Sequence, residues 1–124
     1  MTLEAIERYF SRRCFYHFTD ERNISSIREA GGVLSRRELQ KRKIQVAAPG
    51  GNQWSRDADD LVGLDNYVHL CFMSEHPMEF RAREEGRIQQ SRFLQIGSEV
   101  LATDDVRVTL EVSNKRGAAL LTLE

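Results

Sequence analysis

The sequence predicts an α+β domain in which strands and short helices alternate along one chain. Short apolar or alternating runs, typical of strands, are separated by segments that carry helix caps and helix stops. The length points to a single core, because two cores within 124 residues would each leave too much apolar surface in water. We therefore expect residues 1–124 to form one domain.

The first strand is predicted to run directly into the first helix. The aromatic-rich stretch "RCFYHFT" at residues 13–19 suits a strand. The stretch "TDERNISSIREAGG" that overlaps its end has Thr19 or Asp20 as a helix cap, acidic residues in its first turn and a pair of glycines as its stop. A strand followed at once by a helix places His17 and Thr19 at the junction.

A second helix and a long loop follow. Ser35 and Glu38 form a capping box ahead of "RRELQKRK", whose charged face would be solvated in most proteins. Residues 45–64 show no period, contain a Pro-Gly-Gly turn and hold the only tryptophan. A loop of this length in a small domain tends to be functional.

The stretch "YVHLCF" at residues 67–72 is predicted to be a strand, followed by a helix over "SEHPMEFRAREEG". Ser74 or Glu75 would cap this helix, with Pro77 in its first turn and Gly86 at its end. Two further strands are expected at "SRFLQI" and in the alternating "VRVTLEV", and "ALLTL" is a candidate for one more.

The polar residues of the "YVHLCF" strand need an explanation. Strand alternation would put Val68, Leu70 and Phe72 on a core face, and Tyr67, His69 and Cys71 on the other. That second face either lines a cleft or points to solvent at a sheet edge. His17 is likewise either hydrogen-bonded within the core or, together with Thr19, Tyr67 and His69, part of one small-molecule pocket.

Composition excludes several classes. Charged residues make up 30% and apolar residues 40%, as in ordinary globular domains. A net charge of −1 means that any contact with nucleic acid needs a local patch. No apolar run approaches the roughly 20 residues of a membrane span, and the first fifteen residues lack a secretory signal, so we expect a cytoplasmic protein. Cys14 and Cys71 are expected to be core residues, and no metal or phosphate-loop motif is present.

Four stretches together resemble the DarT-like DNA ADP-ribosyltransferases: "YHFTDERNISSIREAGGVLS", "GGNQWSRDADDLVGLDNYVHLCFMSEHPM", "FLQIGSEVL" and "VSNKRGAALLTLE". The resemblance implies an ADP-ribosyltransferase-like split β-sheet with NAD in the cleft between its halves. It implies transfer of ADP-ribose from NAD, the co-substrate, to a base in single-stranded DNA. It also implies a toxin whose partner is a macrodomain antitoxin.

The resemblance assigns roles to particular residues. His17 and Thr19 match the motif that holds the nicotinamide riboside end of NAD, and the NAD-binding set also includes Asn23, Tyr67 and Met78. Arg56 is the candidate catalytic arginine, preferred to Arg42, although an exposed solvated arginine fits as well. Trp54 and Arg42 are candidates for contacts with single-stranded DNA. Their alternatives are a tryptophan that fills the core under a loop and an ordinary solvated helix.

One departure from the family concerns the catalytic glutamate. In the family it lies beyond the part of the pattern that "NKRGAALLTLE" matches, and Glu124 falls too early to take its place. We therefore expect a partial domain without turnover, and the alternative function is a non-catalytic module that binds NAD or nucleic acid. Missing strands would leave a sheet edge through which the chain could form a homodimer. A tRNA phosphotransferase relative would share the His-x-Thr pattern but not the Asn-Tyr-Val block.

Overall fold

Helices and strands alternate along the chain in the computed structural model, which describes residues 2–9, 14–46, 63–103, 105–109 and 121–122. This confirms the α+β prediction. The elements are α1 Leu3–Tyr9, β1 Phe15–Asp20, the 3₁₀ helix η1 Glu21–Asn23, α2 Ile24–Ala30, α3 Arg36–Lys41, η2 Leu64–Asn66, α5 Pro77–Glu84, β2 Ser91–Ile96, η3 Ser98–Ala102, β3 Arg107–Val108 and β4 Leu121–Thr122. They divide into two compact units, residues 16–94 and residues 1–15 with 95–124.

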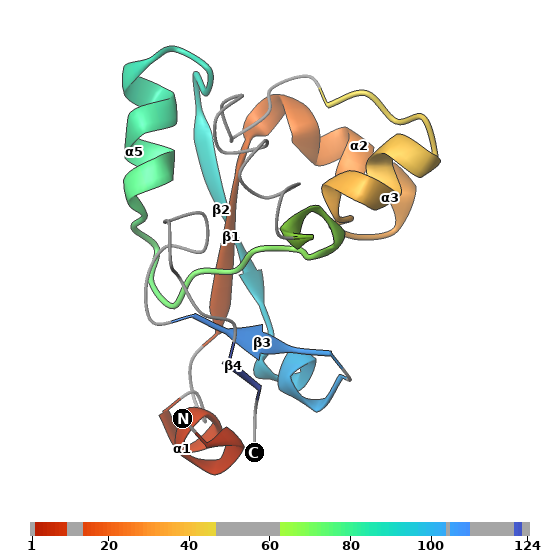
Figure 1. Ribbon diagram of the computed structural model, residues 1–124. Coiled ribbons are helices and arrows are strands. Elements are labelled where there is room, and N and C mark those ends of the chain that lie inside the picture. The colour runs from red at the N-terminus through yellow and green to blue at the C-terminus, as the bar shows by residue number, and fades with distance from the viewer. Residues whose placement is uncertain (1, 10–13, 47–62, 104, 110–120, 123–124) are drawn as a thin grey trace. The chain divides into compact units, whose positions relative to one another are not determined.

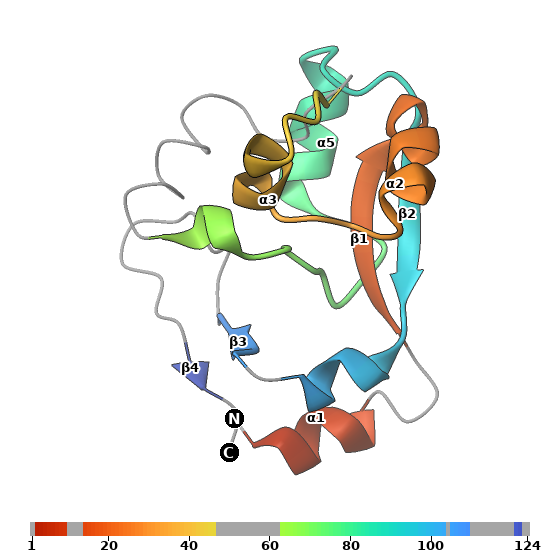
Figure 2. The same ribbon diagram turned by 90° about the vertical axis from the view of Figure 1, so that its right-hand side faces the viewer.

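The larger unit is built on the pair of strands β1 and β2. The backbone N–H of Glu21, just past β1, donates to the carbonyl of Gln90, just before β2, at 2.9 Å. The end of β1 therefore meets the start of β2, and the strands run antiparallel (Figure 2). The helices α5 and α2 lie on opposite sides of this pair (Figure 1). On one face the ring of Phe93 contacts Tyr16 and Phe18, with centroids 6.4 and 6.2 Å apart.

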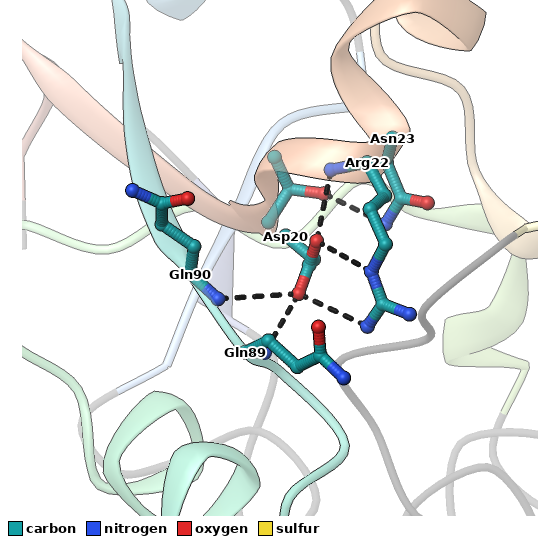
Figure 3. A network of polar contacts seen from close by, with 6 residues as sticks. Asp20, Arg22, Asn23, Gln89 and Gln90 are labelled. Atoms are coloured by element: carbon teal, nitrogen blue, oxygen red, sulfur yellow. Dashed lines mark hydrogen bonds and ion pairs between the residues drawn. The ribbon is translucent and has the colours of Figure 1, made fainter.

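The junction between β1 and the following helices depends on Asp20, whose surface is 1% exposed. Its carboxylate accepts hydrogen bonds from the backbone N–H and the guanidinium of Arg22, at 2.8 to 3.2 Å. It also accepts the backbone N–H groups of Gln89 and Gln90, at 2.8 and 3.4 Å (Figure 3). The Arg22 guanidinium and these N–H groups hold the pKa of Asp20 well below its usual range. Asp20, not Thr19, is thus the helix cap.

The helix ends follow their sequence signals. Gly31 ends α2 in the left-handed conformation, at φ 87°, which only glycine adopts without strain. Ser35 accepts the backbone N–H of Glu38 at 3.2 Å, as its predicted cap should. The carboxylate of Glu38 pairs instead with Arg42, at 2.8 Å.

The strand prediction for residues 67–72 is wrong. Only Cys71 pairs, through an isolated antiparallel bridge in which it exchanges backbone hydrogen bonds of 2.7 and 2.8 Å with Tyr16. Val68 is 37% and Phe72 43% exposed, so the predicted core face does not exist. The physical reason is local. The segment begins at the turn of η2, where the Leu64 carbonyl accepts the N–H of Tyr67, so this N–H is not left for a sheet ladder.

The predicted cap of the third helix is also wrong. Neither Ser74 nor Glu75 caps α5; His76 does, because its Nδ1 accepts the backbone N–H of Met78 at 3.1 Å. Pro77 occupies the first helical turn as predicted, where its missing N–H costs nothing.

In the smaller unit, α1 lies against η3, and Ile6 and Leu101 from these two elements are buried. The predicted strand at 91–96 is β2, most of which belongs to the larger unit. From "VRVTLEV" and "ALLTL" the described part forms β3 and β4, which pair antiparallel with Arg107 opposite Thr122. Residues 110–112 of the first stretch lie outside the described residues.

Replacing Asp20 by Asn is expected to lower the free energy of unfolding by roughly 3 kcal/mol. The NH₂ group of the asparagine would face an N–H donor that now binds a carboxylate oxygen. The Arg22 guanidinium would also lose the negative charge with which it pairs. Urea denaturation followed by circular dichroism measures the change. The matched control is Glu85→Gln, since Glu85 forms an exposed pair with Arg87 at 2.8 Å and should cost less than about 0.5 kcal/mol. Equal small losses in both variants would contradict the role of Asp20.

Candidate functional site

The candidate site begins on the face of β1 that carries His17 and Thr19, which alternation puts on the same side. The Nδ1 atom of His17 lies 3.0 Å from the backbone carbonyl of His69. A carbonyl can only accept a hydrogen bond, so Nδ1 carries the proton. In the neutral ring, Nε2 is then an unprotonated acceptor.

The environment favours this neutral ring. Burial lowers the pKa of His17, the hydrogen bond to His69 opposes that shift in part, and the nearby His69 ring adds to it. With a pKa below the ordinary value of about 6.5, the ring is uncharged at neutral pH. The site thus offers a hydrogen-bond acceptor without a positive charge.

Thr19 and Asn23 form a buried pair beside it. The amide of Asn23 donates to the Thr19 hydroxyl at 3.1 Å, and both residues are less than one tenth exposed. The Thr19 oxygen accepts this bond and keeps its own proton for donation. His17 and Thr19 together present an acceptor and a donor, which suits a ligand rich in hydroxyl and amide groups.

Tyr67 lies in a segment, residues 64–71, that we call the strap. The strap begins with η2, and Tyr67 is half-buried directly after it. At the start of the strap, Asp65 accepts two hydrogen bonds from the guanidinium of Arg37 in α3, at 3.1 and 2.9 Å. Asp65 is 9% exposed, so this ion pair is partly withdrawn from water. Neither residue stands out in the sequence, because a charged face such as that of α3 is solvated in most proteins.

Met78 lies in the first turn of α5, next to the cap residue His76. The ring of His76 stacks on Phe18, with centroids 5.7 Å apart. Phe18 points to the face of β1 opposite His17. The structure therefore brings His17, Thr19, Asn23 and the strap together, while the start of α5 contacts the other face of β1.

Of the three remaining predicted site residues, Arg42 alone is among those that the structure describes. Arg56 and Trp54 lie outside the described residues. Arg42 is exposed at the end of α3 and pairs with Glu38.

A shallow groove of about 620 Å³ lies between α2 and β2, also in the larger unit. Three arginines line it, Arg22, Arg28 and Arg92, against one acid, Glu21. Arg22 is bound to Asp20 and Arg92 pairs with Glu21 at 3.1 Å. Within the described part of the chain, the guanidinium of Arg28 has no ion-pair partner. The groove therefore keeps an excess of positive charge.

The described ranges also bear on metal binding, thiol reactivity and membrane-spanning helices. No three His, Cys, Asp or Glu side chains among these residues gather closely enough to hold a metal ion. Burial raises the pKa of the Cys71 thiol to about 11, so it is a poor nucleophile. No helix in the part of the chain that the structure describes is long and apolar enough to cross a membrane.

The comparisons with known proteins give one match. The family model of DarT, described as ssDNA thymidine ADP-ribosyltransferase, matches residues 16–117, which is most of the chain. Searches of curated proteins and of solved structures gave no match.

The stability of the fold is expected to fall as the pH drops below about 6.5. Burial lowers the pKa of both His17 and His76 in the folded protein, so the unfolded chain binds more protons in this range. Both neutral rings therefore contribute fully to the free energy of unfolding above the pKa that they have in the unfolded chain. This contribution is lost as the pH falls through their pKa in the folded protein. Urea unfolding at several pH values between about 8 and 5 measures the effect.

The matched variant for this prediction is His76→Asn. Asparagine is a good helix cap and has no titrating group, so the variant should fold normally and lose less stability on acidification than the wild type. Identical pH profiles for the two proteins would show that His76 does not contribute.

Proposed function

We propose that this chain, which belongs to the DarT family of single-stranded-DNA thymidine ADP-ribosyltransferases, binds NAD at the His17 face of β1 and transfers ADP-ribose to a thymine base in single-stranded DNA. ADP-ribosyltransferases use NAD as their co-substrate. The observation that supports the proposal most directly is the protonation state of His17. Its Nδ1–H is donated to His69, which leaves Nε2 as an acceptor for a ribose hydroxyl.

A neutral His17 also suits the reaction. As the bond to nicotinamide breaks, its electron pair leaves with nicotinamide and positive charge builds on the ribose. A thymine ring nitrogen then bonds to the ribose carbon, and its proton is released to water. An imidazolium next to that carbon would repel the developing charge. Burial lowers the pKa of His17 and so supports a site that does not add this repulsion.

The other proposed contacts follow the family motif. The Thr19 hydroxyl, held by Asn23, would donate to the nicotinamide riboside end of NAD, and Tyr67 would supply an apolar wall. Met78 is proposed on the family motif alone, since the start of α5, where it lies, contacts the other face of β1. Arg56 is proposed as the catalytic arginine, on the strength of its place in the matched block alone. We propose that the protein acts as a toxin with a macrodomain antitoxin as its partner, as the family membership suggests. A homodimer through a sheet edge also stays a prediction.

Contacts to the DNA are proposed at two places. Trp54 and Arg42 would engage bases and phosphates by stacking and charge. The groove between α2 and β2 would hold a phosphodiester through Arg28, whose charge is not used within the described residues.

NAD binding should be detected by calorimetry in the micromolar to millimolar range, and His17→Asn should weaken it by roughly tenfold or more. The Asn amide can still donate to the His69 carbonyl in place of Nδ1, so the fold is kept, but the Nε2 acceptor is gone. The control is Glu4→Gln, in the exposed pair with Arg8. Equal affinities in the wild type and His17→Asn would contradict the proposed site.

Transfer is measured separately, with oligonucleotides that contain or lack thymidine and a mass increase of one ADP-ribose as the readout. NAD-dependent modification of the thymidine oligonucleotide alone supports the proposal. NAD binding without any modification would contradict transfer by this chain. It would favour the expectation drawn from the sequence, a form without turnover that acts as a non-catalytic NAD-binding module.

Arg28→Gln is expected to weaken binding of a thymidine-rich single strand by about threefold to tenfold. Because one phosphate contact is lost, the slope of log affinity against log salt should become shallower by roughly 0.7. Fluorescence anisotropy at several salt concentrations gives both values. The control is Arg8→Gln, an exposed arginine of α1 paired with Glu4 at 3.1 Å. An unchanged slope in Arg28→Gln would show that the groove does not contact the strand.

A further inference from the structure

The strap is attached to the rest of the larger unit at both ends. At its start, Asp65 is held by the two hydrogen bonds from Arg37. At its end, Cys71 exchanges two backbone hydrogen bonds with Tyr16. Tyr16 precedes His17 in β1, so this bridge fixes the end of the strap next to the strand that carries the candidate site.

His69 lies between these two attachments and makes two different bonds. Its backbone carbonyl accepts Nδ1–H of His17 at 3.0 Å. Its own ring, through Nε2, donates to the carbonyl of Leu64 at 3.1 Å. The imidazole therefore closes the turn of the strap, and the same residue presents the carbonyl that His17 uses.

The Leu64 carbonyl is positioned in turn by the ion pair. Leu64 is 4% exposed and begins η2, and Asp65 is the next residue. The side-chain surface of Asp65 is 10% exposed and that of Arg37 is 56% exposed. A carboxylate so far withdrawn from water keeps its place only while the guanidinium stays paired with it. Loss of the pair would let η2 move, and the anchor of the His69 ring would move with it.

From these contacts we infer that Arg37, Asp65 and His69 are positioning residues that hold His17 in its Nδ1–H form. The ion pair of Arg37 and Asp65 holds η2 in place. The Leu64 carbonyl of η2 holds the His69 ring, and the His69 carbonyl holds His17. The hydrogen bond at one ring nitrogen decides which nitrogen carries the proton. The consequence for NAD binding rests on the proposed function, but the inference about the His17 ring does not.

The test reads the His17 ring directly by NMR. In ¹⁵N-labelled full chain without NAD, at a pH where the ring is neutral, long-range ¹H–¹⁵N correlation distinguishes a protonated from an unprotonated ring nitrogen. The wild type should show Nδ1 protonated and Nε2 unprotonated. His69→Ala and Asp65→Asn should shift His17 toward a mixture of the two tautomers.

Arg37→Lys keeps the charge but loses the paired N–H groups of the guanidinium, and its side chain is more than half exposed, so it should remain folded. Arg37→Lys therefore tests the same ion pair if Asp65→Asn does not fold. The control is Arg87→Lys, in the exposed pair with Glu85. A well-folded Arg37→Lys and a well-folded His69→Ala that both keep the wild-type His17 tautomer would overturn the inference.

NAD affinity is the second readout. If the wild type binds NAD, Arg37→Lys should weaken binding by about fivefold and His69→Ala by about tenfold, while Arg87→Lys should leave it unchanged. If the wild type does not bind NAD, the proposed function fails, and the tautomer of His17 still decides the inference. A shifted tautomer with unchanged affinity would overturn the link to binding.

Discussion

The buried carboxylate of Asp20 is the constraint on which the larger unit depends. It accepts hydrogen bonds from the first turn after β1 and from the turn before β2, two segments about seventy residues apart in the chain. It therefore sets both the direction in which the chain leaves β1 and the place where β2 begins. A buried negative charge is tolerated here because a guanidinium and several N–H groups surround it.

The candidate site inherits its geometry from this junction. Thr19 precedes Asp20 directly, and Asn23 ends the 3₁₀ turn that Asp20 caps, so the hydroxyl and the amide meet across that turn. His17 lies at mid-strand and receives its hydrogen-bond partner from the strap, 52 residues further along the chain. The site thus combines a rigid junction, formed by neighbours in sequence, with one contact that only the tertiary fold supplies.

The same division explains what the sequence could predict. The stretch "SRFLQI" and the stop at Gly31 depend on neighbouring residues, and local patterns identified them. The same patterns narrowed the cap to Thr19 or Asp20, of which Asp20 is the cap. The stretch "YVHLCF" alternates like a strand, yet its backbone is engaged by its own turn and by a single bridge to Tyr16, which no periodicity reveals. His76 is a rare type of cap, and propensity favoured its neighbours.

The residues of the site divide in the same way. The family motif singled out His17, Thr19 and Asn23, which lie on β1 and η1, and their role in binding NAD stays a prediction. The pair of Arg37 and Asp65 joins α3 to η2 across 28 residues, and each partner alone looks like an ordinary surface charge. Only the tertiary fold joins them.

The contacts that Asp20 makes with the turn before β2 have one more consequence. Asp20 is bound there by the backbone N–H groups of Gln89 and Gln90, and the two glutamine side chains take no part in those bonds. Any residue except proline supplies the same N–H. This turn should therefore tolerate many substitutions, whereas an insertion or a deletion would displace the donors from the carboxylate. The number of residues between α5 and β2, more than their identity, is what the junction requires.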